Sequence, residues 1–279
     1  MNRGRLNSWF LIIVHIAALA TLGWCLTHPP AWPTIGLGLL WYLCSGLAIT
    51  GGYHRLFAHG SYRCSPVVSF FCLLFGAAAV QNSALAWASD HRRHHACPDS
   101  EDDPYDARRG LWWSHIGWIL RSGSARDYSN VRDLTKDRLI MLQHRFYSGA
   151  AFFMAAVVPA LLGNIWHDAL GAFLWAGCVR LVLQYHSTFA INSVAHRFGA
   201  RPYSSRTSAR DNLFVALLTM GEGYHNFHHR FPSDYRNGIR WIDYDPTKWF
   251  VYALEAVGLA SDLKRTPPQA IARARSGQL

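Results

Sequence analysis

Apolar residues gather in five long blocks of this chain, and charged residues fill the segments between the blocks. Only 16% of the residues are charged, compared with about 25% in ordinary globular domains. A helix of about 20 apolar residues is long enough to cross the hydrocarbon core of a bilayer. This distribution predicts an integral membrane protein with several spans. The blocks cover residues 9–26, 34–51, 66–89, 146–162 and 169–191.

The placement of the positive charges predicts the orientation in the membrane. The chain has 27 Lys and Arg against 17 Asp and Glu, a formal net charge of +10. The short connections 27–34 and 163–168 contain no Lys or Arg, whereas the ends of the chain and the long connections are rich in both. Because positive loops stay on the cytoplasmic side, we expect both termini there, in a bacterial inner membrane or the endoplasmic reticulum. The apolar blocks argue against a soluble nucleic-acid-binding protein.

The third apolar block decides how many times the chain crosses the membrane. It is interrupted by Gln81-Asn82-Ser83, and histidine motifs stand before it at His54 and after it at His91. If these histidines share a site, the block returns to the side that it left, so we expect an interfacial helix over 66–89. The expected fold is then all-α, with four transmembrane helices in two hairpins (9–26, 34–51, 146–162 and 169–191). A helical cytoplasmic cap is expected from residues 52–145 and 192–265, in a single domain over 1–279.

Histidine spacing predicts a metal site in that cap. Eight of the fifteen histidines fall in three clusters. Residues at i, i+3 and i+4 share one helical face, so each HxxHH motif is expected to direct three imidazoles to one point. The HxxxxH pair is five residues apart, so it needs a helix end, a local bulge or two different metals to converge. The clusters are His54 and His59; His91, His94 and His95; and His225, His228 and His229.

The number and type of these ligands favour two metal ions. Imidazole suits Zn, Cu, Fe and Ni, but eight histidines exceed what one tetrahedral zinc ion uses. The six cysteines have no CxxC spacing, which argues against iron–sulfur clusters and thiolate sites, and we expect them to be reduced and structural. Carboxylate-bridged di-iron bundles use two Glu-x-x-His motifs, and this sequence has no such pair, since only Glu222 and His225 have that spacing. A histidine-rich di-iron centre fits best.

The segments around the clusters resemble a known family. They read Gly-Gly-Tyr-His54-Arg, Asp90-His91-Arg-Arg-His94-His95 and Gly221-Glu222-Gly223-Tyr224-His225-Asn226-Phe227-His228-His229. Further motifs are Asp103-Pro104, Arg108-Arg109-Gly110, Ser114-His115-x-Gly117-Trp118, Asn192-Ser193-Val194-Ala195-His196, Arg201-Pro202-Tyr203 and Phe231-Pro232-x-Asp234-Tyr235. Together they resemble the membrane-bound acyl-CoA desaturases of the stearoyl-CoA type, over about residues 35–262.

The resemblance implies a full ligand set for two irons, with one asparagine acting through a bridging water. That asparagine is Asn192, which stands four residues before His196 and so shares its helical face. The implied histidine ligands are His54, His59, His91, His94, His95, His196, His225, His228 and His229.

The resemblance also implies residues of a narrow acyl tunnel. Gln81, Trp87 and Thr188 match the family's residues at the bend of the acyl chain, although ordinary packing of Trp87 and helix back-bonding of Thr188 are alternatives. Asn82 and Asp90 match residues that contact the carrier headgroup of the thioester. Ser89 departs from the family, which usually has an arginine there, so another acyl carrier than coenzyme A stays open.

The implied reaction is the O2-dependent insertion of a double bond into a fatty acyl thioester, delta-9-like and with acyl-CoA as the expected substrate. The sequence contains no flavin, nicotinamide or ferredoxin motif, so we expect an external electron donor of cytochrome b5 or ferredoxin type with its reductase. Two alternatives stay open. One is a membrane di-iron hydroxylase of fatty acids or alkanes. The other is a metal- or haem-carrying protein without catalysis, although such carriers usually place polar ligands near the bilayer midplane.

Overall fold

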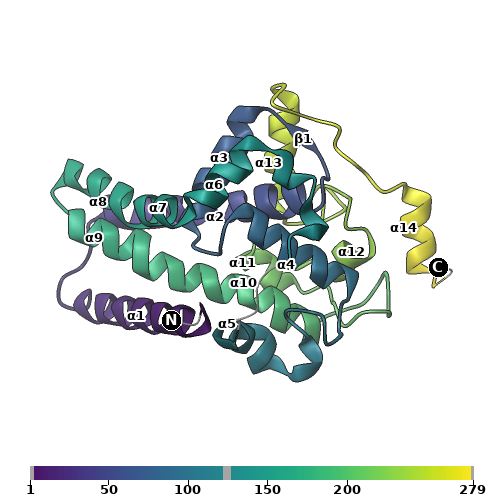
Figure 1. The fold of residues 1–279 in the computed structure, drawn as a ribbon, viewed down its shortest axis with the longest axis horizontal. Coiled ribbons are helices and arrows are strands. Elements are labelled where there is room, and N and C mark those ends of the chain that lie inside the picture. Colours follow the sequence, from purple (N-terminus) through teal and green to yellow (C-terminus); the bar gives the residue numbers. More distant parts are fainter. Residues whose placement is uncertain (1–2, 122–126, 278–279) are drawn as a thin grey trace.

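The computed structural model describes residues 3–121 and 127–277, and most of them are helical. Figure 1 shows two ends of different character. The long helices lie side by side at one end, and shorter helices and loops gather at the other, with the C-terminal helix α14 outermost. The first and last residues of the chain, whose side of the membrane the sequence predicts, lie outside the described residues.

The described chain consists of helices of three kinds and one pair of short strands. The α-helices are α1 (Arg3–Trp24), α2 (Trp32–Leu47), α3 (Pro66–Ala78), α4 (Ala84–Ala96), α5 (Trp118–Arg121), α6 (Arg138–Arg145), α7 (Tyr147–Phe152), α8 (Val158–Gly163), α9 (Ala169–Phe173), α10 (Arg180–Arg197), α11 (Leu213–Leu218), α12 (His225–Arg230), α13 (Pro246–Ala256) and α14 (Pro268–Arg275). The π-helical segments are η1 (Ala48–Ala58), η3 (Trp113–Gly117), η6 (Phe153–Val157) and η8 (Leu174–Val179). Short 3₁₀ turns are η2 (Ala107–Arg109), η4 (Ser129–Val131), η5 (Leu134–Lys136) and η7 (Asn164–Trp166).

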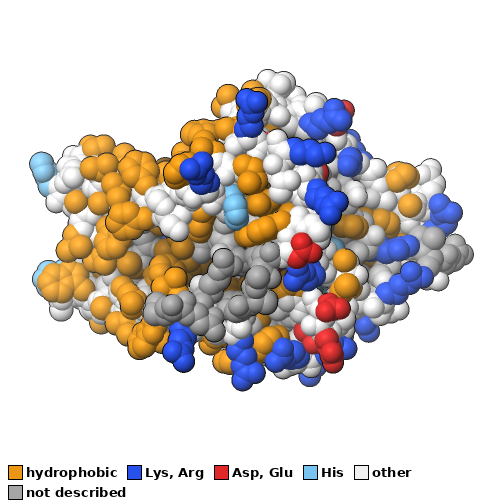
Figure 2. Space-filling model, in the orientation of Figure 1, with side chains coloured by type: hydrophobic (Ala, Val, Ile, Leu, Met, Phe, Trp, Pro, Cys, Tyr) orange, Lys and Arg blue, Asp and Glu red, His pale blue; other side chains and the backbone are white. Residues whose placement is uncertain are grey.

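Among the described residues, three helices are long and apolar enough to cross a membrane: Gly4–Trp24, Trp32–Ala58 and Tyr147–Trp166. A fourth span was expected over 169–191, and a continuous helical run covers 169–197 there. It contains Arg180, Gln184 and His186, which lower its hydropathy. Figure 2 shows apolar side chains spread over the end of the molecule that holds α1 and α7–α9, whereas Lys and Arg lie mostly over the opposite end.

The segment 66–89, for which a single interfacial helix was expected, falls in two helices. Helix α3 ends at Ala78, and α4 begins at Ala84 after a turn. In that turn Val80 and Asn82 have positive φ angles of 52° and 75°, which a continuing helix does not allow. The hydroxyl of Ser83 then accepts the N–H of Ala86 and starts the new helix as its N-cap.

A two-residue antiparallel ladder also departs from the expected all-α fold. Strand β1 (Arg63–Cys64) pairs with β2 (Ala260–Ser261), with Arg63 opposite Ser261 and Cys64 opposite Ala260. The ladder joins the chain just after η1 to the chain just after α13. It therefore ties the C-terminal part of the cap to the end of a long helix.

Helix α3 packs closely against η1 at Gly76, where the ring of Tyr53 occupies the space of a side chain. A methyl group on Gly76 would lie 2.3 Å from the ring of Tyr53, which is fully buried. Gly36 on α2 has open space where its methyl group would be. The first glycine is therefore required by packing, whereas the second is not.

We expect Gly76→Ala to lower the free energy of unfolding by about 1–3 kcal/mol, because the added methyl group forces Tyr53 out of a filled core. Gly36→Ala is the matched control and should leave stability unchanged or slightly raised, since alanine favours a helix. Thermal unfolding of both variants in detergent measures the difference. Equal stability of the two variants would contradict this account of the α3–η1 contact.

Candidate metal centre

Nine buried or half-buried histidines form two adjacent groups in the described part of the chain, at the cap end of the long helices. Within each group the ligand atoms lie within 4.8 Å of one another. All nine histidines named by the sequence motifs belong to these groups. The first group is His54, His59, His91, His95 and His228, and the second is His94, His196, His225 and His229.

A π-helical turn brings the HxxxxH pair together. Helix α2 continues without a break into η1, where the N–H of His59 donates to the carbonyl of His54, an i→i−5 bond of 3.1 Å. This wider turn places residues five apart on one side, and the two imidazole centroids are 4.9 Å apart. The local bulge or helix end that the spacing required is therefore present. Such π segments are frequent at functional sites.

Each HxxHH motif divides between the two groups, so the expected convergence of three imidazoles on one point is wrong. On α4, His91 and His95 join the first group and His94 the second. On α12, His228 joins the first group, whereas His225 and His229 join the second. The reason is geometric. Positions i and i+4 project to one side of a helix, whereas i+3 projects to the other side of the same face, so one motif can serve two neighbouring points.

Carboxylates fix the outward-facing nitrogen of two of these imidazoles. The Nδ1–H of His54 donates to Glu222 at 2.7 Å, and the Nδ1–H of His94 donates to Asp103 at 2.8 Å. The Nδ1–H of His196 donates to the hydroxyl of Ser208 at 2.7 Å, and this hydroxyl in turn donates to Asp99. With its proton held at Nδ1, each ring presents the Nε2 lone pair to the centre. Carboxylate–histidine pairs of this kind orient metal ligands.

The inward nitrogens have too few protons for the contacts that they make. His228 Nε2 lies 2.9 Å from Nε2 of both His54 and His95. In the second group, His225 Nε2 lies 3.0 Å from that of His196 and 3.1 Å from that of His229. A ring nitrogen has at most one proton to donate, so these short contacts cannot all be hydrogen bonds. Lone pairs that converge in this way fit metal cations.

Burial keeps six of the nine imidazoles neutral near pH 7. It lowers the pKa of six ring systems well below the usual 6.5, and the neighbouring imidazoles and other cations lower the values further. Neutral imidazole is the form that binds metals. The six are His59, His91, His95, His225, His228 and His229.

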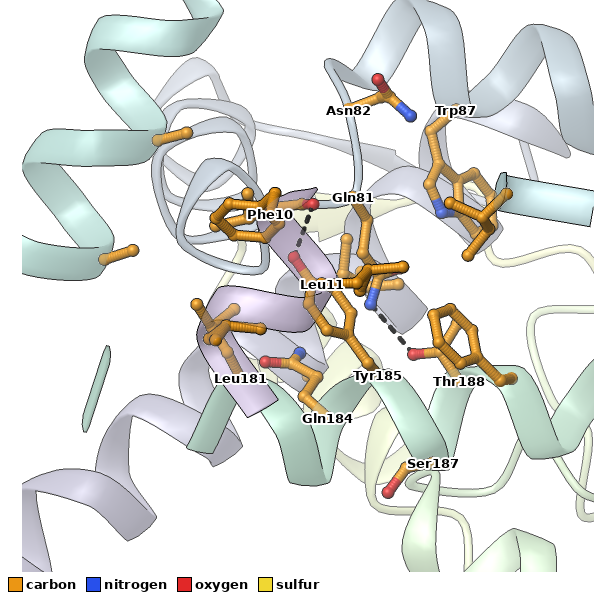
Figure 3. A pocket seen from close by; sticks show the side chains of 18 of the residues that line it. Phe10, Leu11, Gln81, Asn82, Trp87, Leu181, Gln184, Tyr185, Ser187 and Thr188 are labelled. Atoms are coloured by element: carbon orange, nitrogen blue, oxygen red, sulfur yellow. Dashed lines mark hydrogen bonds between the residues drawn. The ribbon is translucent and has the colours of Figure 1, made fainter. Parts of the chain in front are cut away.

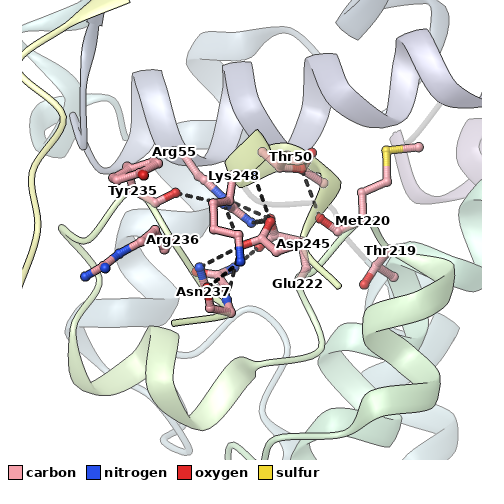
Figure 4. A network of polar contacts seen from close by, with 12 residues as sticks. Thr50, Arg55, Thr219, Met220, Glu222, Tyr235, Arg236, Asn237, Asp245 and Lys248 are labelled. Atoms are coloured by element: carbon pink, nitrogen blue, oxygen red, sulfur yellow. Dashed lines mark hydrogen bonds and ion pairs between the residues drawn. The ribbon is translucent and has the colours of Figure 1, made fainter. Parts of the chain in front are cut away.

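A buried ion-pair network supports the first group from behind (Figure 4). Arg55 donates to Glu222 and to Asp245 at 2.9 Å each, and all three side chains are buried. Burial opposes ionisation of Glu222, but His54 and Arg55 outweigh it and lower the pKa of this carboxyl to about 2. Lys248 extends the network by donating to the carbonyl oxygens of Gly238 and other loop residues.

The sequence motifs included three of these supporting residues, Arg55, Glu222 and Asp103, without revealing their roles. Glu222 lies 167 residues after Arg55 along the chain, so no local spacing relates them. Asp99 and Asp103 are two of several acidic residues in the segment 99–106, so the sequence does not single them out. An acidic residue flanked by glycines directly before a histidine cluster was the one available signal for Glu222.

A cavity of about 830 Å³ extends from the metal centre between the long helices. His54, His91 and His225 contribute to its wall. Apolar side chains of α1 and α10 line much of the rest, including Phe10, Leu11 and Leu181, as Figure 3 shows. A long apolar chain would fit this space with one part next to the histidines.

The structure brings together the residues that the sequence assigned to the acyl chain. The side-chain amide of Gln81 donates to the hydroxyl of Thr188 at 3.0 Å (Figure 3). Trp87 stacks on the ring of His91 with centroids 4.8 Å apart. All three side chains line the cavity, and so do the other predicted contact residues and the asparagine of the predicted ligand set. Those residues are Asn82, Asp90 and Asn192.

Side chains from other helices determine the turn that presents Gln81. Arg180 is buried and donates to the carbonyl of Ala78 at 2.8 Å, and the hydroxyl of Tyr185 donates to the carbonyl of Val80 at 2.9 Å. The hydroxyl of Tyr147 accepts the N–H of Asn82. Ser89, at the position where the resembled family usually has an arginine, is fully buried, and its hydroxyl lies 2.9 Å from Oδ1 of Asn130 and 3.0 Å from the carbonyl oxygen of Asp127. These contacts tie α4 to the segment 127–130.

Comparison with known proteins identifies the family. A model of the fatty acid desaturase family matches residues 30–254. The chain is 36% identical to human stearoyl-CoA desaturase 5 over 287 residues, which is 97% of this chain and 84% of that protein. The chain therefore belongs to the fatty acid desaturase family, and the resemblance read from the histidine motifs is confirmed.

Yeast relatives are more similar in sequence but longer. The chain is 41% identical to a probable acyl-CoA desaturase of Schizosaccharomyces pombe, with 94% of this chain and 55% of that protein covered. It is also 41% identical to acyl-CoA desaturase 1 of Saccharomyces cerevisiae, with 96% and 55% covered. The chain thus spans about half the length of these two relatives.

We expect Asp103→Asn to weaken metal binding by about 10- to 100-fold, because the amide no longer fixes the proton of His94 at Nδ1. The exposed pair Asp262–Arg63 offers a control, and Asp262→Asn should bind metal like the unaltered protein. Competition with a chelator, followed by elemental analysis of the retained metal, measures the affinity. Equal retention by the two variants would show that Asp103 does not support a metal ligand.

Proposed function

We propose that this chain is a four-span membrane protein whose catalytic cap faces the cytoplasm. The spans lie within the helices Gly4–Trp24, Trp32–Ala58 and Tyr147–Trp166 and the helical run 169–197. Three of them meet the length and hydropathy of a span, and the fourth packs against α1 and α2 through η8 and α10. The distribution of Lys and Arg supports the orientation, with the termini on the cytoplasmic side of a bacterial inner membrane or the endoplasmic reticulum.

We propose further that the protein is an acyl-CoA desaturase that inserts a double bond into a fatty acyl chain, delta-9-like, with O2 as co-substrate. The observation that carries this proposal is the opening of both histidine groups, through His54, His91 and His225, into one long apolar cavity. Family membership supports it, and relatives are named acyl-CoA desaturases.

Two iron ions are the metals that we propose for the centre. The five histidines of the first group would hold one ion, and the four of the second group would hold the other, with Asn192 acting through a water. When bound, iron and O2 supply the oxidising power that removes hydrogen from an unactivated methylene, which no side chain can do. The protein contributes ligation, orientation and the exclusion of water.

The cavity residues would position the acyl chain. Gln81 and Thr188 close one side of the cavity by their mutual hydrogen bond, and Trp87 forms the wall next to His91. We propose that the chain bends here and presents one pair of carbons to the metals, since fixed positioning sets selectivity. Asn82 and Asp90 would contact the carrier headgroup. Electrons would come from an external carrier of cytochrome b5 or ferredoxin type with its reductase.

We expect cells that express the protein to accumulate a new unsaturated fatty acid, detected by mass spectrometry. His94→Ala should abolish this product, because the second histidine group then has only three members. His167→Asn is the matched control, since His167 is exposed, lies outside both groups and has a φ of 59°, which asparagine tolerates. A hydroxylated product would replace the proposal with a membrane hydroxylase, and equal products from His94→Ala would refute it.

We expect Thr188→Val to broaden the double-bond position while leaving iron content unchanged. The substitution keeps the shape of the side chain but removes the acceptor for Gln81. Loss of one such hydrogen bond, about 1 kcal/mol, should relax discrimination between neighbouring carbons by about fivefold. Thr21→Val, which removes only a bond within α1, should keep the original position. An unchanged product from Thr188→Val would show that the bond does not set the register.

A further inference from the structure

A second cavity, of about 720 Å³, lies on the outer face of the cap beneath α14. Three arginines line it: Arg236, Arg265 and Arg275. Arg236 is fixed by a bidentate contact to Asp234. Arg265 is half exposed, and its one carboxylate neighbour among the described residues, Glu255, is 3.9 Å away. We call this feature the arginine groove.

The arginine groove lies directly behind the helix that carries three of the nine histidines. Ile271 and Ala274 of α14 pack in one buried cluster with Tyr203 and Phe227, and Phe227 stands on α12 immediately before His228. A single layer of side chains therefore separates the groove from α12.

Aromatic and hydrogen-bonded contacts connect the arginine groove to α12 without a break. Arg275 donates to the hydroxyl of Tyr203 at 2.6 Å, and the Tyr203 and Phe227 rings meet edge to face with centroids 5.2 Å apart. The backbone N–H of Tyr203 donates to Asn226 at 2.8 Å, and Asn226 follows His225 in sequence. Electron transfer through protein slows steeply with distance, so an electron carrier has to dock where little protein covers the metals.

Charge and position indicate what the groove binds. The chain after Asp262 contains Lys264, Arg265, Arg273 and Arg275 but no Asp or Glu, so this edge of the cap attracts anions. Among the described residues, none lines both the groove and the acyl cavity, which separates the groove from the proposed acyl-CoA. In Figure 1, α14 lies at the opposite end of the molecule from α8 and α9, away from the apolar surface that would face lipid.

We propose that the arginine groove is the docking surface for the external electron carrier, a small protein with an acidic surface. The inference rests on the proposed function. Carboxylates of the carrier would pair with Arg265 and Arg275, and the contact would be small and transient, as in other electron-transfer complexes. Positive charge at this edge would mainly raise the association rate.

The electron balance defines the role of this surface. One turnover joins O2, two electrons and two protons with the –CH2–CH2– unit to give –CH=CH– and two waters. The acyl chain supplies two hydrogens. The carrier supplies the two electrons in two successive encounters, and one carrier molecule is oxidised by one electron in each encounter. Two docking events at the groove are therefore needed for each double bond.

The test compares charge-reversed variants of the full chain, loaded with iron in lipid nanodiscs. Pre-reduced soluble cytochrome b5 and pre-reduced ferredoxin are the two probes, and stopped-flow absorbance follows their oxidation. We expect Arg265→Glu/Arg275→Glu to lower the second-order rate constant by about tenfold or more at low ionic strength. The unaltered protein should lose rate as salt is added, whereas the variant should not. Arg138→Glu reverses an exposed charge on α6, away from the groove, and should stay within about twofold of the unaltered protein.

Further variants separate charge from folding. Arg275→Lys keeps the charge and should retain most of the rate, even though it loses part of the contact with Tyr203. Equal rates in the reversed variant and Arg138→Glu would overturn the proposal, as would oxidation of neither carrier by protein that dithionite reduces. A loss confined to discs that contain phosphatidylglycerol would assign the groove to lipid headgroups instead. A raised KM for acyl-CoA would assign it to substrate phosphates.

Failure of the proposed function gives a different result from failure of the docking surface. If the unaltered protein, reduced chemically, forms no unsaturated product from bound acyl-CoA, the desaturase proposal fails. If it forms product but charge reversal leaves both carriers' rates unchanged, only the docking surface is wrong.

Discussion

Nine imidazoles point toward two neighbouring centres. Their lone pairs repel one another unless cations lie between them, so the surrounding residues have to hold the rings in place. The buried pairs His54–Glu222 and His94–Asp103 fix proton positions, so the inward nitrogens cannot satisfy one another by changing tautomer. Arg55 compensates the charge of Glu222, which makes a buried carboxylate tolerable at this position. The rest of the cap follows from the need to keep these groups buried and aligned.

The same helices that form the apolar end of the molecule carry the centre. Helix α2 becomes η1 and delivers His54, and the run 169–197 ends one residue after His196. Because the helices continue from one end into the other, the acyl cavity between them opens directly onto the histidines. A rigid connection of this kind sets the distance from the cavity wall to the metal ligands without a flexible loop.

Sequence reasoning found the histidines but not what orients them. The apolar blocks and the HxxHH spacings are local patterns, so they predict helices and ligand types reliably. Arg55 and Glu222 stand 167 residues apart, and Gln81 and Thr188 stand 107 apart, so no local pattern relates either pair. The resemblance to a family supplied the second of these pairs as an expectation, and it supplied nothing about the first.

Three features were thus determined by the sequence alone: a helical chain with long apolar segments, clusters of imidazole ligands, and membership of one family. Only the tertiary structure decided that each HxxHH motif divides between two centres, because this depends on how α4 and α12 face each other. It also decided that residues 66–89 break into α3 and α4. That turn exists because Arg180 and Tyr185, about 100 residues further along the chain, satisfy carbonyl groups that a continuing helix would have used.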